Sequence, residues 1–201
     1  MEKLVFLPGA SGNIEFWKPL IEFLPKNYEK QIIGYPGFGN IAEDTSLESF
    51  CDLQEYVTGQ INSESILIAQ SMGGIFAVQK AFTEPSLIKG LVLIATSGGI
   101  DLTSFNVQDW RNEYREQYPR YPEWFMTTNV NYDAYLEKIN IPTLLIWGDA
   151  DPISPVAVGK YLNTKLKGST LKIISKGKHN LAEEYAKEIS AYINQFLESL
   201  S

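Results

Sequence analysis

The sequence predicts an α/β fold, with about six mostly parallel strands, helices on both faces of the sheet and a short helical cap inserted after residues 91–95. Three observations predict it. Short apolar runs alternate with amphipathic stretches along the whole chain. The runs are apolar at consecutive positions, as in strands that are covered on both faces. Each run is bounded by Gly, Pro, Ser or Asp, which favour turns. Repetition of strand and helix in this way is typical of a parallel sheet between two helical layers.

The expected strands are rich in leucine or β-branched residues, and they lie at 4–7, 31–33, 65–69, 91–95, 143–147 and 171–174. The helical patterns between them lie at roughly 13–24, 46–61, 72–83, 153–164 and 181–199. No apolar stretch approaches the roughly 18–20 residues that a membrane-spanning helix needs. The short apolar start breaks at Pro8 and Gly9, which is typical of a first strand and not of a signal peptide. We therefore expect a single domain over 1–201.

One stretch interrupts the alternation of strands and helices. The segment at about 98–140 is rich in tryptophan and tyrosine, and Trp110, Tyr114 and Tyr118 are spaced by four residues, which places them on one face of a helix. We expect a cap of two or three short helices here. Most of its aromatic residues would attach the cap to the body, while Trp110, Tyr114 and Trp124 are candidates for a substrate wall.

Composition excludes several classes of function. The net charge is −7 and no basic cluster is present, which argues against nucleic acid or an anionic membrane as a partner. The only cysteine, Cys51, leaves no internal disulfide and no cysteine cluster for zinc, and its helical surroundings favour a buried structural thiol. With a single histidine as well, we expect no metal and no cofactor. A cytoplasmic protein is the expectation, and the sequence leaves its oligomeric state open.

The stretch ILIAQSMGGIFA (66–77) places Ser71 where a buried strand changes to a helix. A sharp turn of this kind exposes a serine hydroxyl above the edge of the sheet, and it requires small residues two before and two after the serine. Ala69 and Gly73 fill those positions. Ser71 is therefore a candidate nucleophile, although a serine followed by two glycines is also compatible with a simple helix cap.

Two further candidates follow later strands. Asp149 and Asp151 come after the strand at 143–147, and His179 comes after the strand at 171–174. Carboxyl ends of parallel strands meet at one edge of the sheet, where ligands bind in folds of this class. The order serine, acid, histidine is that of a triad in a sheet of this type. The only histidine thus occupies the position that a general base for Ser71 needs.

Five segments together resemble the α/β-hydrolase superfamily, in particular its small carboxylesterases and acyl hydrolases. They are LPGASGNIEFW (7–17), GYPGFGN (34–40), AQSMGG (69–74), INIPTLLIWGDADPISP (139–155) and GKHNLAEEYAKEISAYINQFL (177–197). The resemblance covers nearly the whole chain and implies a three-layer sandwich. The sequence departs from the family pattern in having Pro8 in place of a loop histidine and Ala69 in place of the first glycine of the elbow. Compared with the family pattern, we also expect the leading antiparallel hairpin to be missing and the cap to be reduced.

The resemblance implies a serine hydrolase that cleaves a carboxylic ester or thioester of a small to medium acyl group through an acyl-enzyme. Ser71 would be the nucleophile, His179 the base, and Asp151, three residues after Gly148, the acid, with Asp149 as the alternative. The backbone N–H groups of Ala10 and Met72 would form the oxyanion hole. The same residues also suit a lyase or a carbon–carbon bond hydrolase, and a non-catalytic binding protein with this fold is a third reading. With His179 as the base, the rate should fall in acid as the imidazole becomes protonated.

Overall fold

The computed structural model describes residues 2–200, which form a six-stranded, all-parallel sheet in the order β2-β1-β3-β4-β5-β6. All six expected strands are confirmed, and a helical cap follows the fourth. The strands are β1 (Lys3–Leu7), β2 (Glu29–Ile32), β3 (Ser65–Gln70), β4 (Ile88–Ile94), β5 (Thr143–Gly148) and β6 (Thr170–Ile174). β3, β4 and β5 are buried along almost their whole length, which explains their continuous apolar sequences.

Helices connect the strands and cover both faces of the sheet. On one face, α1 (Lys18–Ile21), α8 (Leu181–Glu184) and α9 (Ala186–Ser199) pack against side chains such as Leu4, Ile68 and Ile146. On the other face, α2 (Phe50–Gly59), α3 (Gly73–Thr83) and α7 (Val156–Lys165) pack against Val5, Leu67 and Leu145. Because successive residues of a strand point to opposite faces, each buried strand contributes side chains to the hydrophobic cores on both faces of the sheet.

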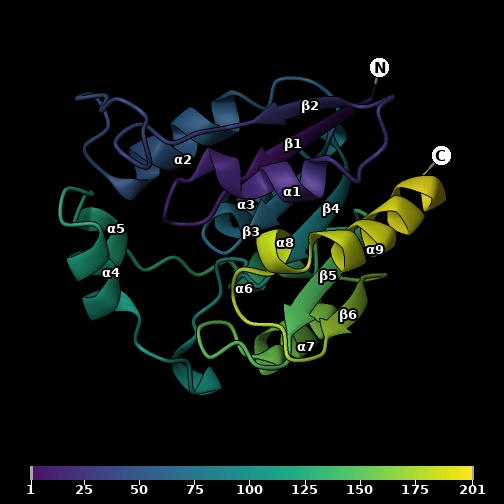
Figure 1. Ribbon diagram of the computed structural model, residues 1–201. Helices are drawn as coiled ribbons and strands as arrows, with labels where there is room; N and C mark the ends of the chain where they lie inside the picture. Colours follow the sequence, from purple (N-terminus) through teal and green to yellow (C-terminus); the bar gives the residue numbers. More distant parts are fainter. Residues whose placement is uncertain (1, 201) are drawn as a thin grey trace.

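The cap lies at one side of the body, beyond the carboxyl ends of the strands (Figure 1). It contains η3 (Thr103–Phe105), α4 (Arg111–Gln117), α5 (Trp124–Thr127) and α6 (Asp133–Leu136). In Figure 1, α4 and α5 stand apart from the sheet, whereas α6 lies against the body. Phe125 and Met126 of α5 join the core that covers the α2–α3 face, so the cap shares a hydrophobic core with the body.

Two expected helices are shorter than their sequence patterns. The 13–24 pattern becomes η1 (Ile14–Trp17), a 3-10 helix, followed by the single turn of α1. Asn13 caps this segment by accepting a hydrogen bond from the backbone N–H of Glu15. The 46–61 pattern begins its helix only at Phe50, where Ser49 accepts a hydrogen bond from the N–H of Asp52. A last short element, η2 (Pro85–Leu87), leads into β4.

The expectation of a buried thiol at Cys51 is wrong. Cys51 is exposed, because the buried face of α2 is formed by Phe50, Leu53, Gln54 and Val57. Apolar neighbours at helical spacing indicated the helix correctly, but Cys51 lies outside its apolar stripe. Within residues 2–200, no helix is both long and apolar enough to span a membrane.

The topology creates one crevice at the end of the sheet. The chain passes from β1 outward to β2 and then returns to the other side of β1 for β3, so the direction of winding changes between β1 and β3. The helices that follow these two strands, α1 and α3, cover opposite faces of the sheet, and parallel α/β sheets bind ligands at such a point. The loop after β1 and Ser71, which follows β3, both lie there.

Candidate active site

Ser71 occupies a strained turn between β3 and α3. Its φ is +52°, a left-handed conformation that is uncommon for residues other than glycine. The turn is held on both sides of the serine. The N–H of Ser71 donates to the carbonyl of Ile94 (3.1 Å), and its own carbonyl accepts from Thr96 Oγ1 (2.6 Å) and from the N–H of Gly74 (3.0 Å). These hydrogen bonds hold Ser71 in an unfavourable backbone conformation, and such strained residues are common at functional sites.

The small residues around Ser71 are required by close packing. A Cβ atom on Gly73 would lie 2.2 Å from the carbonyl oxygen of Leu7, and one on Gly74 would lie 2.3 Å from Thr96 Oγ1. Ala69 is fully buried between β1 and β4. Gly9, in the loop after β1, faces the serine directly, because a Cβ there would lie 3.2 Å from Ser71 Cβ. The loops after β1 and β4 therefore pack closely around the turn that carries Ser71.

His179 joins Ser71 to Asp151. The Nε2 atom of His179 lies 3.0 Å from Ser71 Oγ, and its Nδ1 atom lies 2.8 Å from Asp151 Oδ2. The three residues come from the loops after β6, β3 and β5. The carboxylate of Asp151 accepts a hydrogen bond from Nδ1–H, so Nε2 is left with a lone pair directed at the serine hydroxyl. This arrangement favours transfer of the serine proton to the imidazole.

The two aspartates after β5 have different partners. The side chain of Asp151 is fully buried, and its Oδ1 atom accepts from the N–H groups of Ile153 (2.9 Å) and Ser154 (3.0 Å). Asp149 is exposed, and its Oδ1 accepts from the N–H of Lys176 (2.6 Å), a residue with φ of +60°. Of the two expected acids, the structure thus brings Asp151 to the histidine and uses Asp149 to hold the loop after β6.

Gln70 has a structural role that was not predicted from the sequence. Its side chain is 3% exposed, its Nε2 donates to the carbonyl of His179 (2.8 Å), and its Oε1 accepts from the N–H of Ala182 (3.4 Å). The residue directly before Ser71 therefore holds the loop that carries His179. A polar residue that directly follows the apolar run 66–69 was the only signal in the sequence.

The backbone N–H groups of Met72 and Ala10, the expected oxyanion donors, belong to two segments that lie beside Ser71. Met72 follows Ser71, and Ala10 lies in the loop after β1, here called the β1 loop (residues 8–12). Within residues 2–200, neither N–H makes a hydrogen bond to another group. Gly12 has φ of +60° and donates its N–H to the carbonyl of Gly9 (3.0 Å), which closes the β1 loop into a turn.

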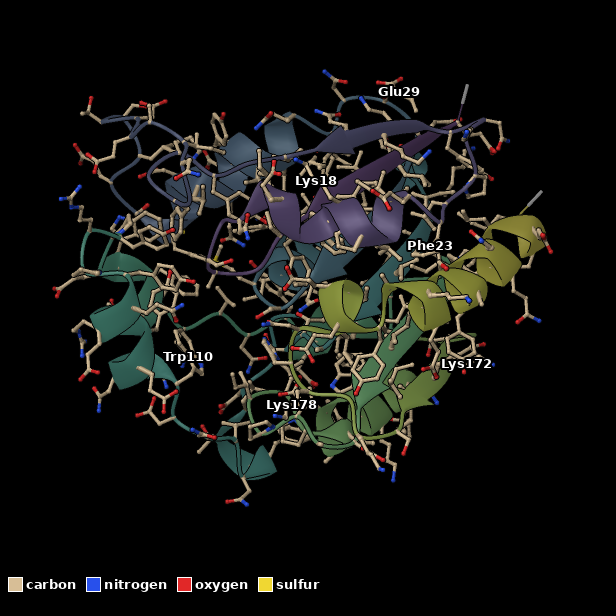
Figure 2. All side chains as sticks on the ribbon, in the orientation of Figure 1. Lys18, Phe23, Glu29, Trp110, Lys172 and Lys178 are labelled. Atoms are coloured by element: carbon tan, nitrogen blue, oxygen red, sulfur yellow. The ribbon has the colours of Figure 1, made fainter. Side chains whose placement is uncertain are left out.

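A cavity of about 320 Å³ opens over these groups, and Ser71, His179, Ala10 and Met72 all line it. Trp110, at the start of α4 (Figure 2), and Tyr114 form part of its cap side. Trp124 does not line it, so the expectation of a pocket role for this residue is wrong. The Trp124 ring packs 6.1 Å from that of Phe38 and 6.4 Å from that of Phe50, between cap and body.

Other groups lining the cavity were not singled out from the sequence. They include Phe16 and Ile75 from the body, and Phe125 and Met126 from α5. Apolar residues of these types are expected in either a core or a pocket, and the pattern alone does not separate the two. Across residues 2–200, no set of three or more His, Cys, Asp or Glu side chains is placed to hold a metal ion.

A sequence model of the Alpha/beta hydrolase family matches residues 4–140, which is more than half of the chain. The match runs from β1 through the cap and includes Ser71, but ends before Asp151 and His179.

Three similar proteins are distant from this chain in sequence. The chain is 22% identical to a pimeloyl-[acyl-carrier protein] methyl ester esterase of Neisseria meningitidis, across 100% of this chain and 78% of that protein. A thermophilic esterase from Thermogutta terrifontis has a TM-score of 0.81 at 17% identity, covering 100% of this chain and 90% of that one. The meta-cleavage product hydrolase of Pseudomonas fluorescens has a TM-score of 0.82 at 14% identity, covering 100% and 92%. Both solved structures share the fold of this chain, and one is named an esterase and the other a meta-cleavage product hydrolase.

Proposed function

The chain belongs to the α/β-hydrolase family, and from that premise we propose that it is a serine hydrolase that cleaves a carboxylic ester or thioester through an acyl-enzyme. The observation that carries the proposal is the chain of contacts Ser71 Oγ–His179 Nε2 (3.0 Å) and His179 Nδ1–Asp151 Oδ2 (2.8 Å) beside a cavity. A hydroxyl becomes an effective nucleophile when an adjacent base takes its proton and a third group orients that base.

The first half of the reaction forms the acyl-enzyme. Ser71 Oγ attacks the carbonyl carbon of the substrate while His179 Nε2 accepts the hydroxyl proton, and the carbonyl oxygen becomes an oxyanion. The N–H groups of Ala10 and Met72 stabilise this charge, because they border Ser71 and have no other hydrogen-bond partner among residues 2–200. The imidazolium then gives its proton to the leaving alcohol or thiol, and the acyl group stays on Ser71.

The second half releases the acid. A water molecule attacks the acyl-enzyme, His179 accepts a proton from that water, and the collapsing intermediate returns the proton to Ser71 Oγ. The buried carboxylate of Asp151, held in place by the N–H groups of Ile153 and Ser154, orients His179 and stabilises the imidazolium.

The cavity supports a small to medium acyl group. Its volume of about 320 Å³ is near the lower end of the ~300–1,000 Å³ range of ligand pockets. Trp110, Tyr114, Phe125 and Met126 give it an apolar cap side, which suits the hydrocarbon part of an ester. The neisserial relative is named for hydrolysis of a methyl ester, which agrees with an ester as the substrate class.

Hydrolysis of p-nitrophenyl esters from acetate to laurate tests the proposal. We expect Ser71→Ala to lower kcat/KM by about 10⁴-fold or more, because removal of the nucleophile abolishes the acyl-enzyme route. Ser63→Ala is the matched control, since Ser63 is an exposed serine in the loop before β3, at the opposite end of that strand. The acyl chain length that gives the highest kcat/KM shows how long an acyl group the cavity accommodates.

Mass spectrometry of the quenched reaction distinguishes acyl transfer from the other reactions that the same groups support. An adduct of acyl mass on the peptide that contains Ser71 is expected, and it should be absent in Ser71→Ala. Full ester turnover by Ser71→Ala would refute the proposal. Turnover of a non-ester substrate without any acyl adduct would favour the lyase or carbon–carbon hydrolase instead.

A further inference from the structure

Four consecutive carbonyl groups of the β1 loop accept hydrogen bonds, and three of the donors are tyrosine hydroxyls. Tyr35 Oη donates to the carbonyl of Pro8 (2.7 Å), Tyr114 Oη to that of Ala10 (2.7 Å) and Tyr121 Oη to that of Ser11 (2.9 Å). The fourth carbonyl, that of Gly9, accepts from the N–H of Gly12 (3.0 Å). A loop in which four consecutive carbonyls are engaged has few ways to rotate its peptide planes.

Two of these tyrosines belong to the cap. Tyr114 lies in α4, and Tyr121 lies between α4 and α5, more than 100 residues after the loop that they contact. Tyr35 comes from the body, in the segment after β2. The cap therefore contributes hydrogen bonds to a loop of the body, in addition to the apolar contacts that its aromatic rings make.

Tyr121 also joins the β1 loop to a second loop. Its hydroxyl accepts a hydrogen bond from the N–H of Gly39 (2.7 Å) while it donates to Ser11. The two loops touch through their backbones here, since a Cβ on Gly39 would lie 2.7 Å from the carbonyl oxygen of Gly12. One hydroxyl thus holds two closely packed loops together.

The tyrosine rings are fixed by their own packing. The ring of Tyr121 stacks on that of Tyr118 at 4.6 Å, and the ring of Tyr114 lies 5.5 Å from that of Phe125. Tyr114 is 8% exposed, and burial raises the pKa of its hydroxyl well above the ordinary value, so the hydroxyl remains a donor in alkaline solution. A rigid donor limits the motion of the carbonyl to which it is bonded.

We propose that Tyr114 and Tyr121 are positioning residues that hold the β1 loop so that the N–H of Ala10 points to the oxyanion formed at Ser71. The inference rests on the proposed function of the site. Tyr114 fixes the carbonyl of Ala10 itself, and Tyr121 fixes the next one, so the backbone on the carboxyl side of Ala10 cannot turn. The peptide between Gly9 and Ala10, which carries the N–H of Ala10, is fixed on the amino side because the N–H of Gly12 donates to the carbonyl of Gly9. The cap thereby completes the catalytic site and does not only cover it.

The test removes the hydroxyls and keeps the rings, with Tyr114→Phe, Tyr121→Phe and the double variant. Tyr135→Phe is the matched control, because Tyr135 lies in α6 of the same insertion, is 43% exposed, and its hydroxyl makes no hydrogen bond within residues 2–200. Complete removal of an oxyanion donor costs about 10²–10³ in kcat. A misplaced donor still gives part of this rate enhancement, so we expect kcat to fall by less, about tenfold in each single variant and further in the double variant. KM should change less than threefold.

Two inhibitors separate a positioning function from a pocket-wall function. An alkyl trifluoromethyl ketone adds to Ser71 Oγ and places an oxyanion at the N–H of Ala10, whereas the corresponding alkyl methyl ketone binds mainly through its chain. We expect the inhibition constant of the trifluoromethyl ketone to rise by the same factor as kcat falls, and that of the methyl ketone to stay unchanged. Unchanged kcat in the double variant, or equal weakening of both ketones, would overturn the inference.

Hydrogen exchange at the amide of Gly12 gives a readout that does not depend on activity. This N–H is bonded within the β1 loop, so it should exchange faster in both tyrosine variants and at the parent rate in Tyr135→Phe. Parent-like exchange would overturn the inference even if kcat fell. If Ser71→Ala keeps the ester turnover of the parent, the proposed function fails, and this exchange rate still decides whether the tyrosines hold the loop. Thermal unfolding of each variant identifies any that does not fold.

Discussion

Exchange of Asp151 for asparagine should remove most of the activity without disrupting the fold. In the native site, Oδ1 of Asp151 accepts from two backbone N–H groups, those of Ile153 and Ser154, while Oδ2 accepts from His179 Nδ1. An asparagine has one carbonyl oxygen and one NH₂ group. The oxygen must face the two backbone donors, because an NH₂ group there would oppose both of them. The NH₂ group is therefore directed at His179.

This orientation gives His179 the wrong tautomer. With a donor opposite Nδ1, that nitrogen becomes the acceptor, and the proton moves to Nε2, where it faces Ser71 Oγ. The imidazole then has no lone pair available for the serine proton. In other triads the corresponding exchange lowers kcat by about 10⁴, which is about 5.4 kcal/mol of transition-state stabilisation at 1.36 kcal/mol for each factor of ten.

Asp149→Asn is the matched control, two residues away on the same loop. Asp149 uses one oxygen to accept from the N–H of Lys176, and an asparagine oxygen can accept the same hydrogen bond. Steady-state hydrolysis of the best p-nitrophenyl ester and thermal unfolding of both variants would be measured. We expect Asp149→Asn to remain within threefold of the parent kcat. The reasoning is refuted if Asp151→Asn stays within tenfold of the parent, or if the two variants lose activity equally.

Two further predictions concern stability. In urea titrations, Gly74→Ala should lower the free energy of unfolding by about 1–3 kcal/mol, because its Cβ would lie 2.3 Å from Thr96 Oγ1. Gly59→Ala at the end of α2 should instead raise the free energy of unfolding by about 0.5–1 kcal/mol, because a Cβ there meets nothing within 4 Å. Equal effects of the two substitutions would contradict the packing argument. Burial raises the pKa of Tyr35 well above its ordinary value, so above about pH 10 the unfolded chain loses this proton first and stability falls as the pH rises. The decline between pH 9 and 11 should be shallower in Tyr35→Phe, and an identical slope would exclude this contribution.

The sheet and the three central site residues could be predicted because each leaves a local signal. Parallel strands buried on both faces are continuously apolar, as in β3 and β5. The carboxyl ends of such strands meet at one edge, so Ser71, Asp151 and His179 could be expected near one another from position alone. Strand position alone did not separate Asp149 from Asp151, since both follow β5. The family resemblance favoured Asp151, and in the structure Asp151 contacts His179, whereas Asp149 is exposed and accepts from the N–H of Lys176.

The contacts of the cap could not be predicted, because its residues have no local signal for their partners. A spacing of four placed Trp110, Tyr114 and Tyr118 on one helical face, but the partner of the Tyr114 hydroxyl is a carbonyl 104 residues earlier. Trp124 packs between cap and body instead of lining the cavity for the same reason. Periodicity predicted the helix that contains Cys51 but not the burial of this residue, since adjacent positions on a helix can be buried and exposed.

The hydrogen bonds from cap to β1 loop change how a cap deletion should be interpreted. Removal of residues 98–140 would open the cavity, and a loss of activity would ordinarily be ascribed to lost substrate binding. The same deletion also removes the donors to the carbonyls of Ala10 and Ser11 and the acceptor for the N–H of Gly39. Loss of kcat would then follow from a loosened β1 loop even for an ester too small to reach the cap. Single hydroxyl removals separate these two effects, because the phenylalanine rings still cover the cavity.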